Sequence, residues 1–563
     1  MKRIVALMLG LLMTIATVGC GKGGFGGVRS DVELDENRTT LVVANWNGGV
    51  GDEWLTTAIE KFEKKYADYS FEKGKKGVQV ILGSNNKTTV GGESLKELIG
   101  TEGCNDDIFF TENVYYQWWA KTGKMLDITD YVNEPLKEFG EDESIVDKMN
   151  DDILSSMSVD GKIYALPFWV GTYCMVYNAT LFDEEEWYIA EDGSYTNASG
   201  KLGNGPDGQA GTYDDGMPAT YEEFFALLDQ IKKDNSTPIL WPGASQDYLM
   251  WLIAELAADN MGYDQFMMNY TFSGEAELAK LDSVNYDTME FETEKVTITE
   301  ENGYELGRQP GLLRAVKFAE RLVQDTSLYD ANKCMSGSYK IAQSQLDFVR
   351  NTTMSSQKDV AILVEGTWWE NEATAAFKET YGSSATKYDA EMDYKVMPLP
   401  KATKEYVGTE NIMVSPLDSF CFIKSDIAEE RKEAAVKFLQ FVHTDAQMTE
   451  FTKMTGLTKP FEYKVDEEGL TSFAKSILET TENSRIVYPM SDNKVYTYSP
   501  STFRLAILLR SAYNPDIGYR DNIVTALAEM KNGEYVYSTE DYMKGIYDYR
   551  KNTLWKTFDS ILK

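Results

Sequence analysis

The sequence of 563 residues contains a single histidine, His443. Catalytic sites of the Ser-His-Asp and Cys-His types, and metal sites built from several histidines, are therefore poorly supported. His443 lies in the stretch AVKFLQFVHTD, near the end of a predicted amphipathic helix, where we expect it to be an ordinary helix-end residue. Catalysis by carboxylates alone remains possible.

Cysteine is also scarce, with five residues in the whole chain. Cys104, Cys174, Cys334 and Cys421 are widely scattered and lack the spacing of metal ligands. Cys174 and Cys421 lie in apolar runs, which predicts buried free thiols. A disulfide from Cys104 or Cys334 remains an open alternative.

The chain has a shortage of positive charge, with 55 basic against 90 acidic residues, a net charge of −35 and an isoelectric point near 4.5. Nucleic-acid binding needs a basic surface, so this balance argues against it. It argues weakly against a highly anionic ligand as well. High acidity often only keeps an exported protein soluble.

The first residues resemble the N-terminal signal segment of a bacterial lipoprotein. Lys2 and Arg3 precede an apolar run over residues 4–18, which is shorter than the approximately 20 residues of a membrane-spanning helix. The exit TVGC resembles a lipobox, although Thr17 stands where that family favours leucine. We expect a signal peptide over residues 1–19, a diacylated Cys20, and a flexible glycine-rich tether to residue 38. A plain secretory peptide is the alternative.

Hydrophobic periodicity then predicts an α/β fold. An apolar strand over residues 39–49 runs into a glycine loop, a helix follows over 52–69, and a second strand over 75–82. This order implies a parallel sheet, with a third strand over 106–112. Gly49 and Gly51 lack the third glycine of a dinucleotide-binding turn. About 530 residues remain after the tether, which is too many for one core, so we expect at least two lobes.

Further segments indicate how the lobes are organised. Residues 160–182 form a long extended run interrupted by Pro167, which suits a strand crossing between two lobes. Thr220 and Glu223 have the spacing of a capping box before a helix, and Thr367 and Glu370 repeat it. The sequence contains no solenoid repeat and no second transmembrane segment.

Five segments, in their order along the chain, resemble the extracellular solute-binding proteins of carbohydrate ABC importers (family 1, the group that includes maltose-binding proteins). They are VVANWNGGVGDEWL, DIFFTE, GKIYALPFWVGTYCMVYN, AILVEGTWWENEA, and SFCFIKS followed by KEAAVKFLQFV. The resemblance implies a two-lobed periplasmic-binding-protein-like fold (type II) that closes on a sugar. It also implies a non-enzymatic protein that requires no cofactor and delivers its ligand to a membrane permease.

The resemblance places hinge crossings near Pro167, residues 413–418 and Tyr488. It therefore predicts a first lobe from residues 39–167 and 416–485, and a second from residues 168–415 and 486–563. The protein would be a monomer, anchored by lipid at the extracellular face of the cell membrane, or at the periplasmic side in a cell with two membranes.

A sugar site needs flat aromatic rings for the C–H faces of pyranoses and planar polar groups for their hydroxyls. Ligands of such sheets bind beyond the carboxyl ends of strands. The candidates at those positions and beside the crossings are Trp46, Asn47, Glu112, Tyr115, Trp169, Tyr173, Trp241, Asp247, Trp251, Glu365, Trp368 and Trp369. Adjacent helical residues point about 100° apart, so at most one of Trp368 and Trp369 should face a ligand. Core packing is the alternative for each tryptophan, and helix capping or a solvated position for the two glutamates.

The acidic, glycine-rich stretch GNGPDGQAGTYDDG raises the hypothesis of a structural calcium site. Asp207, Gly208 and Asp214 match positions 5, 6 and 12 of an EF-hand loop, with Asp215 beside them. Positions 1 and 3 would be Gly203 and Gly205, which offer no side-chain oxygen. A turn without metal is the favoured interpretation.

Three functions compete at this point. The first is a lipid-anchored binding protein for a neutral oligosaccharide that works by hinge closure. The second is a secreted glycoside hydrolase, because paired carboxylates in an aromatic cleft would look similar. The third is a surface adhesion module, which needs no closure.

Overall fold

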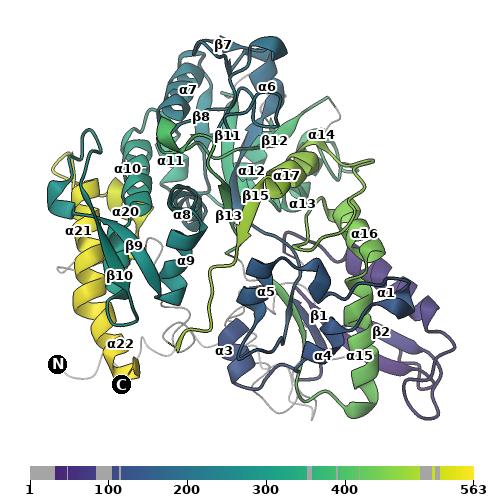
Figure 1. The fold of residues 1–563 in the computed structure, drawn as a ribbon. Helices are drawn as coiled ribbons and strands as arrows, with labels where there is room; N and C mark the ends of the chain where they lie inside the picture. Colours follow the sequence, from purple (N-terminus) through teal and green to yellow (C-terminus); the bar gives the residue numbers. More distant parts are fainter. Residues whose placement is uncertain are drawn as a thin grey trace, which may run out of the picture.

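The computed structural model describes residues 32–46, 48–83, 104–112, 116–350, 358–388, 391–416, 419–494, 510–513 and 520–562. It has two α/β lobes, each built around its own mixed sheet and joined by several chain crossings (Figure 1). The expected fold class is therefore confirmed. Among the described residues, no helix has the length and apolar character needed to span a membrane.

The first lobe holds a five-stranded sheet in the order β2-β1-β3-β14-β4. Its strands are β1 (Thr39–Asn45), β2 (Val78–Leu82), β3 (Ile108–Thr111), β14 (Phe420–Ile423) and β4 (Leu166–Pro167). As predicted, β1 is parallel to β2 and β3, whereas β14 is antiparallel to β3. Buried on both faces, β1 reads as a nearly continuous apolar run.

Helices cover this first sheet. Helix α1 buries Leu55, Ile59 and Phe62 along one face, at the helical spacing seen in the sequence. It lies beside helices that come from much later in the chain, so the lobe is discontinuous. The helices of the lobe are α1 (Glu53–Lys65), α3 (Tyr116–Lys121), α4 (Thr129–Asn133), α5 (Asp151–Met157), α15 (Glu429–Val442) and α16 (Asp445–Thr455), with short 3₁₀ turns at Lys137–Phe139 and Val146–Lys148.

The second lobe is built on a four-stranded sheet in the order β12-β5-β11-β8. The strands are β12 (Tyr394–Met397), β5 (Tyr173–Asn178), β11 (Val360–Gly366) and β8 (Thr237–Leu240). Because β5 runs antiparallel to β11, the start of β5 lies beside the end of β11, with Tyr173 opposite Gly366.

Helix α8 (Asp247–Met261) is the central helix of the second lobe. Every residue from Tyr248 to Asn260 is buried, as expected for a helix surrounded by other elements. Helix α10 (Pro310–Gln324) packs along it, and the other long helices of the lobe are α7 (Tyr221–Lys233), α12 (Ile341–Val349), α14 (Thr374–Tyr381) and α17 (Ser472–Glu482). The predicted capping at Thr220 is present, since its hydroxyl accepts a hydrogen bond from the Glu223 N–H.

Smaller elements complete this lobe. They are α6 (Ala179–Glu184), β6 (Tyr188–Ile189), β7 (Tyr195–Thr196), α9 (Tyr263–Thr271), α11 (Ala331–Cys334), α13 (Trp369–Glu372) and 3₁₀ turns at Ser199–Lys201, Leu281–Ser283 and Lys404–Tyr406. Helix α13 corrects one expectation. The Thr367 hydroxyl accepts from the Thr172 N–H at 3.4 Å, and the residue before the helix makes no side-chain cap, so the predicted second capping box is wrong.

A third group of elements joins the middle of the sequence to its end, at the left of Figure 1. It contains the hairpin of β9 (Gly274–Ala279) and β10 (Thr293–Ile298), the 3₁₀ helix η5 (Gly303–Arg308), α20 (Ile523–Ala528), α21 (Thr539–Tyr549), a π-helical turn at Arg550–Leu554 and α22 (Trp555–Leu562). Two short ribbons, β16 (Arg510–Tyr513) with β17 (Arg520–Asn522) and β18 (Met530–Lys531) with β19 (Glu534–Tyr535), lie in the same part of the chain.

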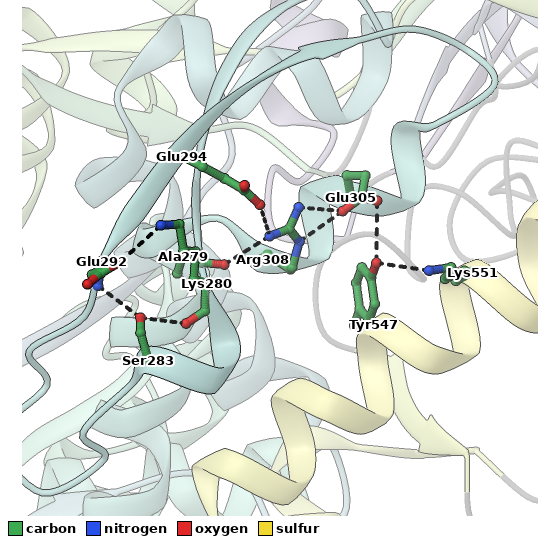
Figure 2. Close-up of polar contacts among 9 residues, drawn as sticks. All are labelled: Ala279, Lys280, Ser283, Glu292, Glu294, Glu305, Arg308, Tyr547 and Lys551. Atoms are coloured by element: carbon green, nitrogen blue, oxygen red, sulfur yellow. Dashed lines mark hydrogen bonds and ion pairs between the residues drawn. The ribbon is translucent and has the colours of Figure 1, made fainter.

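Figure 2 shows the polar network that fastens this group together. Arg308 pairs with Glu305 at 2.6 Å and with Glu294 of β10 at 2.7 Å, and it donates to the Ala279 carbonyl. Tyr547 of α21 donates to Glu305 at 3.3 Å, which extends the network to a helix near the end of the sequence.

The chain passes between the lobes at several points. Strand β4 ends at Pro167 in the first sheet and β5 begins at Tyr173 in the second, so residues 168–172 form one crossing. A second lies between β13 (Asn411–Val414), which pairs with β15 (Ser484–Val487), and β14.

One expected lobe boundary differs from the structure. Residues up to 485 were expected in the first lobe, but α17 packs against β12 of the second sheet, where the Val396 N–H donates to Ser476 at 2.8 Å. The chain therefore returns to the second lobe between α16 and α17. All four cysteines of the described region are buried and unpaired.

Candidate functional site

Five aromatic side chains gather where the chain crosses into the second lobe. We call Trp169, Tyr173, Tyr248, Trp251 and Trp368 the aromatic cluster. Tyr173 stacks on Trp251 with ring centres 6.1 Å apart and an 8° angle, and it meets Trp368 edge-on at 5.0 Å. Tyr248 and Trp169 contact Trp368 at 6.3 and 6.1 Å.

The sheet register explains why these rings meet. Tyr173 is opposite Gly366 in the ladder, and Trp368 follows just after the end of β11. A Cβ on Gly366 would lie 2.2 Å from the Trp368 ring, so this ring covers a position that only glycine can occupy. The cluster thus lies at the carboxyl end of β11, the edge where sheets of this kind hold ligands.

The first lobe approaches the same place. A Cβ on Gly49 would lie 2.7 Å from the Trp368 Cβ, and the Asn371 amide donates to the Gly49 carbonyl at 3.1 Å. Asn371 also donates to the Thr455 carbonyl of α16 at 2.9 Å. Trp46, which is partly exposed, lies in the same loop and packs over Gly48. The aromatic cluster is therefore at the junction of the lobes, where all five of its side chains are buried.

Two carboxyl groups lie beside the cluster, and we call Glu365 and Glu372 the carboxyl pair. The Gln345 amide donates to Glu365 Oε1 at 2.7 Å and to Glu372 Oε2 at 3.3 Å. Glu365 is fully buried, and burial together with the charge of Glu372 holds its pKa well above the ordinary value. Glu372 is exposed, yet desolvation still raises its pKa.

The predicted site residues fall into several groups. Tyr173, Trp251 and Trp368 are in the aromatic cluster with Trp169, and Trp46 lies in the loop that touches it. Glu112 is buried directly after β3. Asn47 and Tyr115 lie outside the described residues.

The remaining three candidates are not part of the aromatic cluster. Trp241 is fully buried, with its ring 4.4 Å from Tyr329 and its N–H donating to Gln246. Trp369 is also fully buried and packs among core rings, including that of Phe473 at 5.1 Å. Asp247 is exposed at the start of α8. The structure thus separates the neighbouring Trp368 and Trp369, placing the first at the lobe junction and the second in a lobe core.

The carboxylate oxygens of the acidic loop accept hydrogen bonds from groups of the loop itself. Asp214 Oδ2 accepts from the Asp207 N–H and Oδ1 from the Thr212 hydroxyl, both at 2.8 Å, and Asp215 accepts from the Gly211 N–H. Burial raises the pKa of Asp214 to about 6. In the part of the chain that the structure describes, which includes the whole loop, no group of three or more acidic, histidine or cysteine side chains is placed to hold a metal ion.

Sequence reasoning missed Tyr248, Gln345 and Glu372. A signal was present for Glu372, which lies four residues after Trp368 and therefore on the same helical face. Tyr248 directly follows the candidate Asp247, and Gln345 could be found only from the packing of α12 against β11.

The chain belongs to the bacterial extracellular solute-binding protein family, whose model matches residues 57–476. The expected family is confirmed, and because its members bind solutes without catalysis, the glycoside hydrolase alternative is wrong. No curated protein sequence matches the chain.

Solved structures of similar fold include several binding proteins. RafE from Streptococcus pneumoniae is 17% identical with a TM-score of 0.51, covering 85% of this chain and 94% of its own. A chitin oligosaccharide binding protein is 18% identical with a TM-score of 0.50, covering 87% and 98%. The bacterial solute receptor AcbH, described as preferring β-D-galactopyranose, is 15% identical with a TM-score of 0.50, covering 92% and 99%. At these identities the likeness establishes the fold.

Proposed function

We propose that this protein captures a neutral oligosaccharide between its two lobes and delivers it to the permease of an ABC importer. The observation that carries the proposal is the aromatic cluster at the lobe junction, with the exposed Glu372 beside it. Flat rings match the C–H faces of pyranoses, and a carboxylate matches their hydroxyls. Two binding proteins of similar fold, one described as binding chitin oligosaccharide and one as preferring β-D-galactopyranose, support this class of ligand.

The same proposal includes attachment to the membrane. Cys20, which lies outside the described residues, would carry the lipid, and the glycines after it would leave the lobes free to move. This arrangement keeps a monomeric receptor close to its permease at the extracellular face.

The test is a thermal-shift screen of the purified protein against raffinose, galactose, maltotriose and chitotriose, followed by calorimetry. Binding to the folded state raises the melting temperature in proportion to the logarithm of the ligand concentration. Small-angle scattering with and without the sugar that binds should then show a smaller particle in the complex, because the lobes close. A surface adhesion module would bind without this contraction, and a panel without any shift would refute the proposal.

A further inference from the structure

Glu372 occupies a distinctive position in the site. It is the last residue of α13, four residues after Trp368, and it is exposed where α13 touches the first lobe through Asn371. The indole of Trp368 lies close to this carboxylate and lowers its pKa, against the larger effect of burial. With the lobes in contact Trp368 is only 4% exposed, so a sugar would reach its ring, and the carboxylate of Glu372 beside it, as the lobes part.

Gln345 and, behind it, Glu365 hold the carboxylate of Glu372 in place. The Gln345 side-chain amide has two hydrogens, and it donates to both members of the carboxyl pair. Glu365 is completely buried, and its Oε2 has no hydrogen-bond partner in the described part of the chain. Two neighbouring carboxyl groups cannot both ionise cheaply, so the buried one keeps the proton and the exposed one carries the charge.

We propose that Glu372 is the specificity-determining acceptor for the hydroxyls of a sugar stacked on Trp368, and that Gln345 and Glu365 are positioning residues that fix its carboxylate. This inference rests on the proposed function and deepens it. The carboxylate accepts hydrogen bonds from adjacent hydroxyls of a neutral sugar. It repels an anionic sugar, so the site rejects uronates.

The experiment measures affinity by calorimetry at pH 7 for the sugar of the four-member panel that binds wild-type protein most tightly, and for trigalacturonate. The variants are Glu372→Gln, Gln345→Leu, Glu365→Gln and Glu365→Leu. Glu184→Gln is the matched control, because Glu184 is exposed on α6 of the same lobe. The melting temperature of each unliganded variant checks that it folds.

We expect Glu372→Gln to weaken binding of the neutral sugar at least tenfold. The ratio of the affinity for the neutral sugar to the affinity for trigalacturonate should also become smaller. Glu365→Gln keeps a neutral acceptor for Gln345 and should stay within threefold of wild type, as should Glu184→Gln. Glu365→Leu and Gln345→Leu should weaken binding about tenfold.

A pH series separates positioning from general damage. The titratable groups near Glu372 among the described residues are Glu365 of β11 and Tyr248 of α8. Wild-type affinity should fall as Glu372 takes up a proton on acidification. The hydrogen bond from Gln345 lowers the pKa of Glu372, so Gln345→Leu should move this loss to higher pH, whereas Glu365→Gln should not.

The outcomes are distinct. Wild-type protein that binds none of the four sugars overturns the proposed function and this inference with it. Wild-type protein that binds, with Glu372→Gln equal to it in affinity and selectivity, overturns the inference alone. A folded Gln345→Leu variant with weakened binding but an unmoved pH midpoint overturns the positioning role.

Discussion

Gly49 of the first lobe and Trp368 of the second are in contact so close that a Cβ on the glycine would lie 2.7 Å from the tryptophan Cβ. Gly49 also has φ +71°, a conformation that other residues adopt only with strain. The close contact with Trp368 and the positive φ angle therefore each require glycine at position 49, in the loop that follows β1.

Replacing Gly49 by alanine should separate the lobes locally and lower the free energy of unfolding by about 1–3 kcal/mol, because of the backbone strain alone, with the steric overlap added to it. Gly51→Ala is a matched control, since Gly51 has φ +75° and no atom within 4 Å of the added Cβ. Urea denaturation of both variants measures the difference. Equal losses would contradict a role for the contact with Trp368.

Glu255 of α8 joins two crossings between the lobes. Its Oε1 accepts from the Thr172 hydroxyl at 2.7 Å, and its Oε2 accepts from the Val414 N–H at 2.9 Å. It lines a cavity of about 40 Å³, room for a few water molecules. Glu255→Leu leaves both donors unsatisfied and should cost about 1–3 kcal/mol for each, measured by chemical denaturation.

The ionisation of Glu255 should change the stability of the protein with pH in a predictable direction. Burial raises its pKa well above the ordinary value, so the folded state holds a proton that the unfolded state has lost. Stability from this group is therefore full below the ordinary pKa and declines as pH rises toward the raised value. Glu255→Gln cannot ionise, so it should gain stability relative to wild type between pH 4 and pH 7. A constant difference across this range would show that Glu255 does not titrate there.

The two adjacent tryptophans should respond differently to truncation. Trp369 is fully buried among core rings, so Trp369→Ala should destabilise the protein by about 3–5 kcal/mol. Trp368 covers Gly366 at the lobe junction, so Trp368→Ala should abolish sugar binding at a smaller loss of stability. Calorimetric titration and denaturation of both variants test this. Retained binding by a folded Trp368→Ala variant would remove Trp368 from the site.

His443 should contribute to acid sensitivity. Its Nδ1 donates to the Leu439 carbonyl at 2.7 Å, and burial, aided by the nearby charge of Lys459, lowers its pKa to about 3. As pH falls below about 6.5, the unfolded state takes up a proton that the folded state refuses. Stability should then fall by up to about 1.4 kcal/mol for each pH unit until the folded pKa is reached.

The comparison is with His443→Asn, which keeps a donor for the Leu439 carbonyl but has no charge to gain. Urea unfolding from pH 7 to pH 4 should show a shallower decline in this variant than in wild type. Parallel curves would mean that other groups cause the acid sensitivity.

The lipid anchor makes its own prediction. Cys20→Ala should release the protein from membranes into the soluble fraction, because the acylated sulfur is missing. Globomycin should cause the unprocessed precursor to accumulate. Immunoblots of membrane and soluble fractions measure both effects, with Cys104→Ala as the control cysteine. Unchanged membrane attachment of Cys20→Ala would rule out the anchor.

Local sequence signals predicted local structure well. The strand–helix–strand order at the start of the first lobe and the N-terminal cap by Thr220 depend on residues near one another, and both are present, although the Glu223 carboxylate accepts from the Ala219 N–H and so does not complete the predicted capping box. Thr367 shows where this fails. The spacing of Thr367 and Glu370 satisfies the capping pattern. The hydroxyl of Thr367 instead accepts a hydrogen bond from the Thr172 N–H, which the crossing before β5 brings next to it.

The site was harder to predict than the fold, for a similar reason. The sequence pattern places Trp241 after a strand and Trp368 and Trp369 at the start of the helix after another, but only the packing of α8 and β11 decides which ring reaches the lobe junction. Gln345 reaches Glu365 across 20 positions of sequence, a contact that no spacing rule reveals. The exposure of Glu372 likewise depends on where the first lobe approaches.

The network around Arg308 in Figure 2 has a consequence for biosynthesis. Residues 274–308 can make all their native contacts only after Tyr547 of α21 has been synthesised, close to the end of the chain. The first sheet waits as well, because β14 inserts between β3 and β4. A chain that ends before residue 420 therefore lacks part of both lobes, and one that ends before Tyr547 leaves the contacts of Glu305 incomplete.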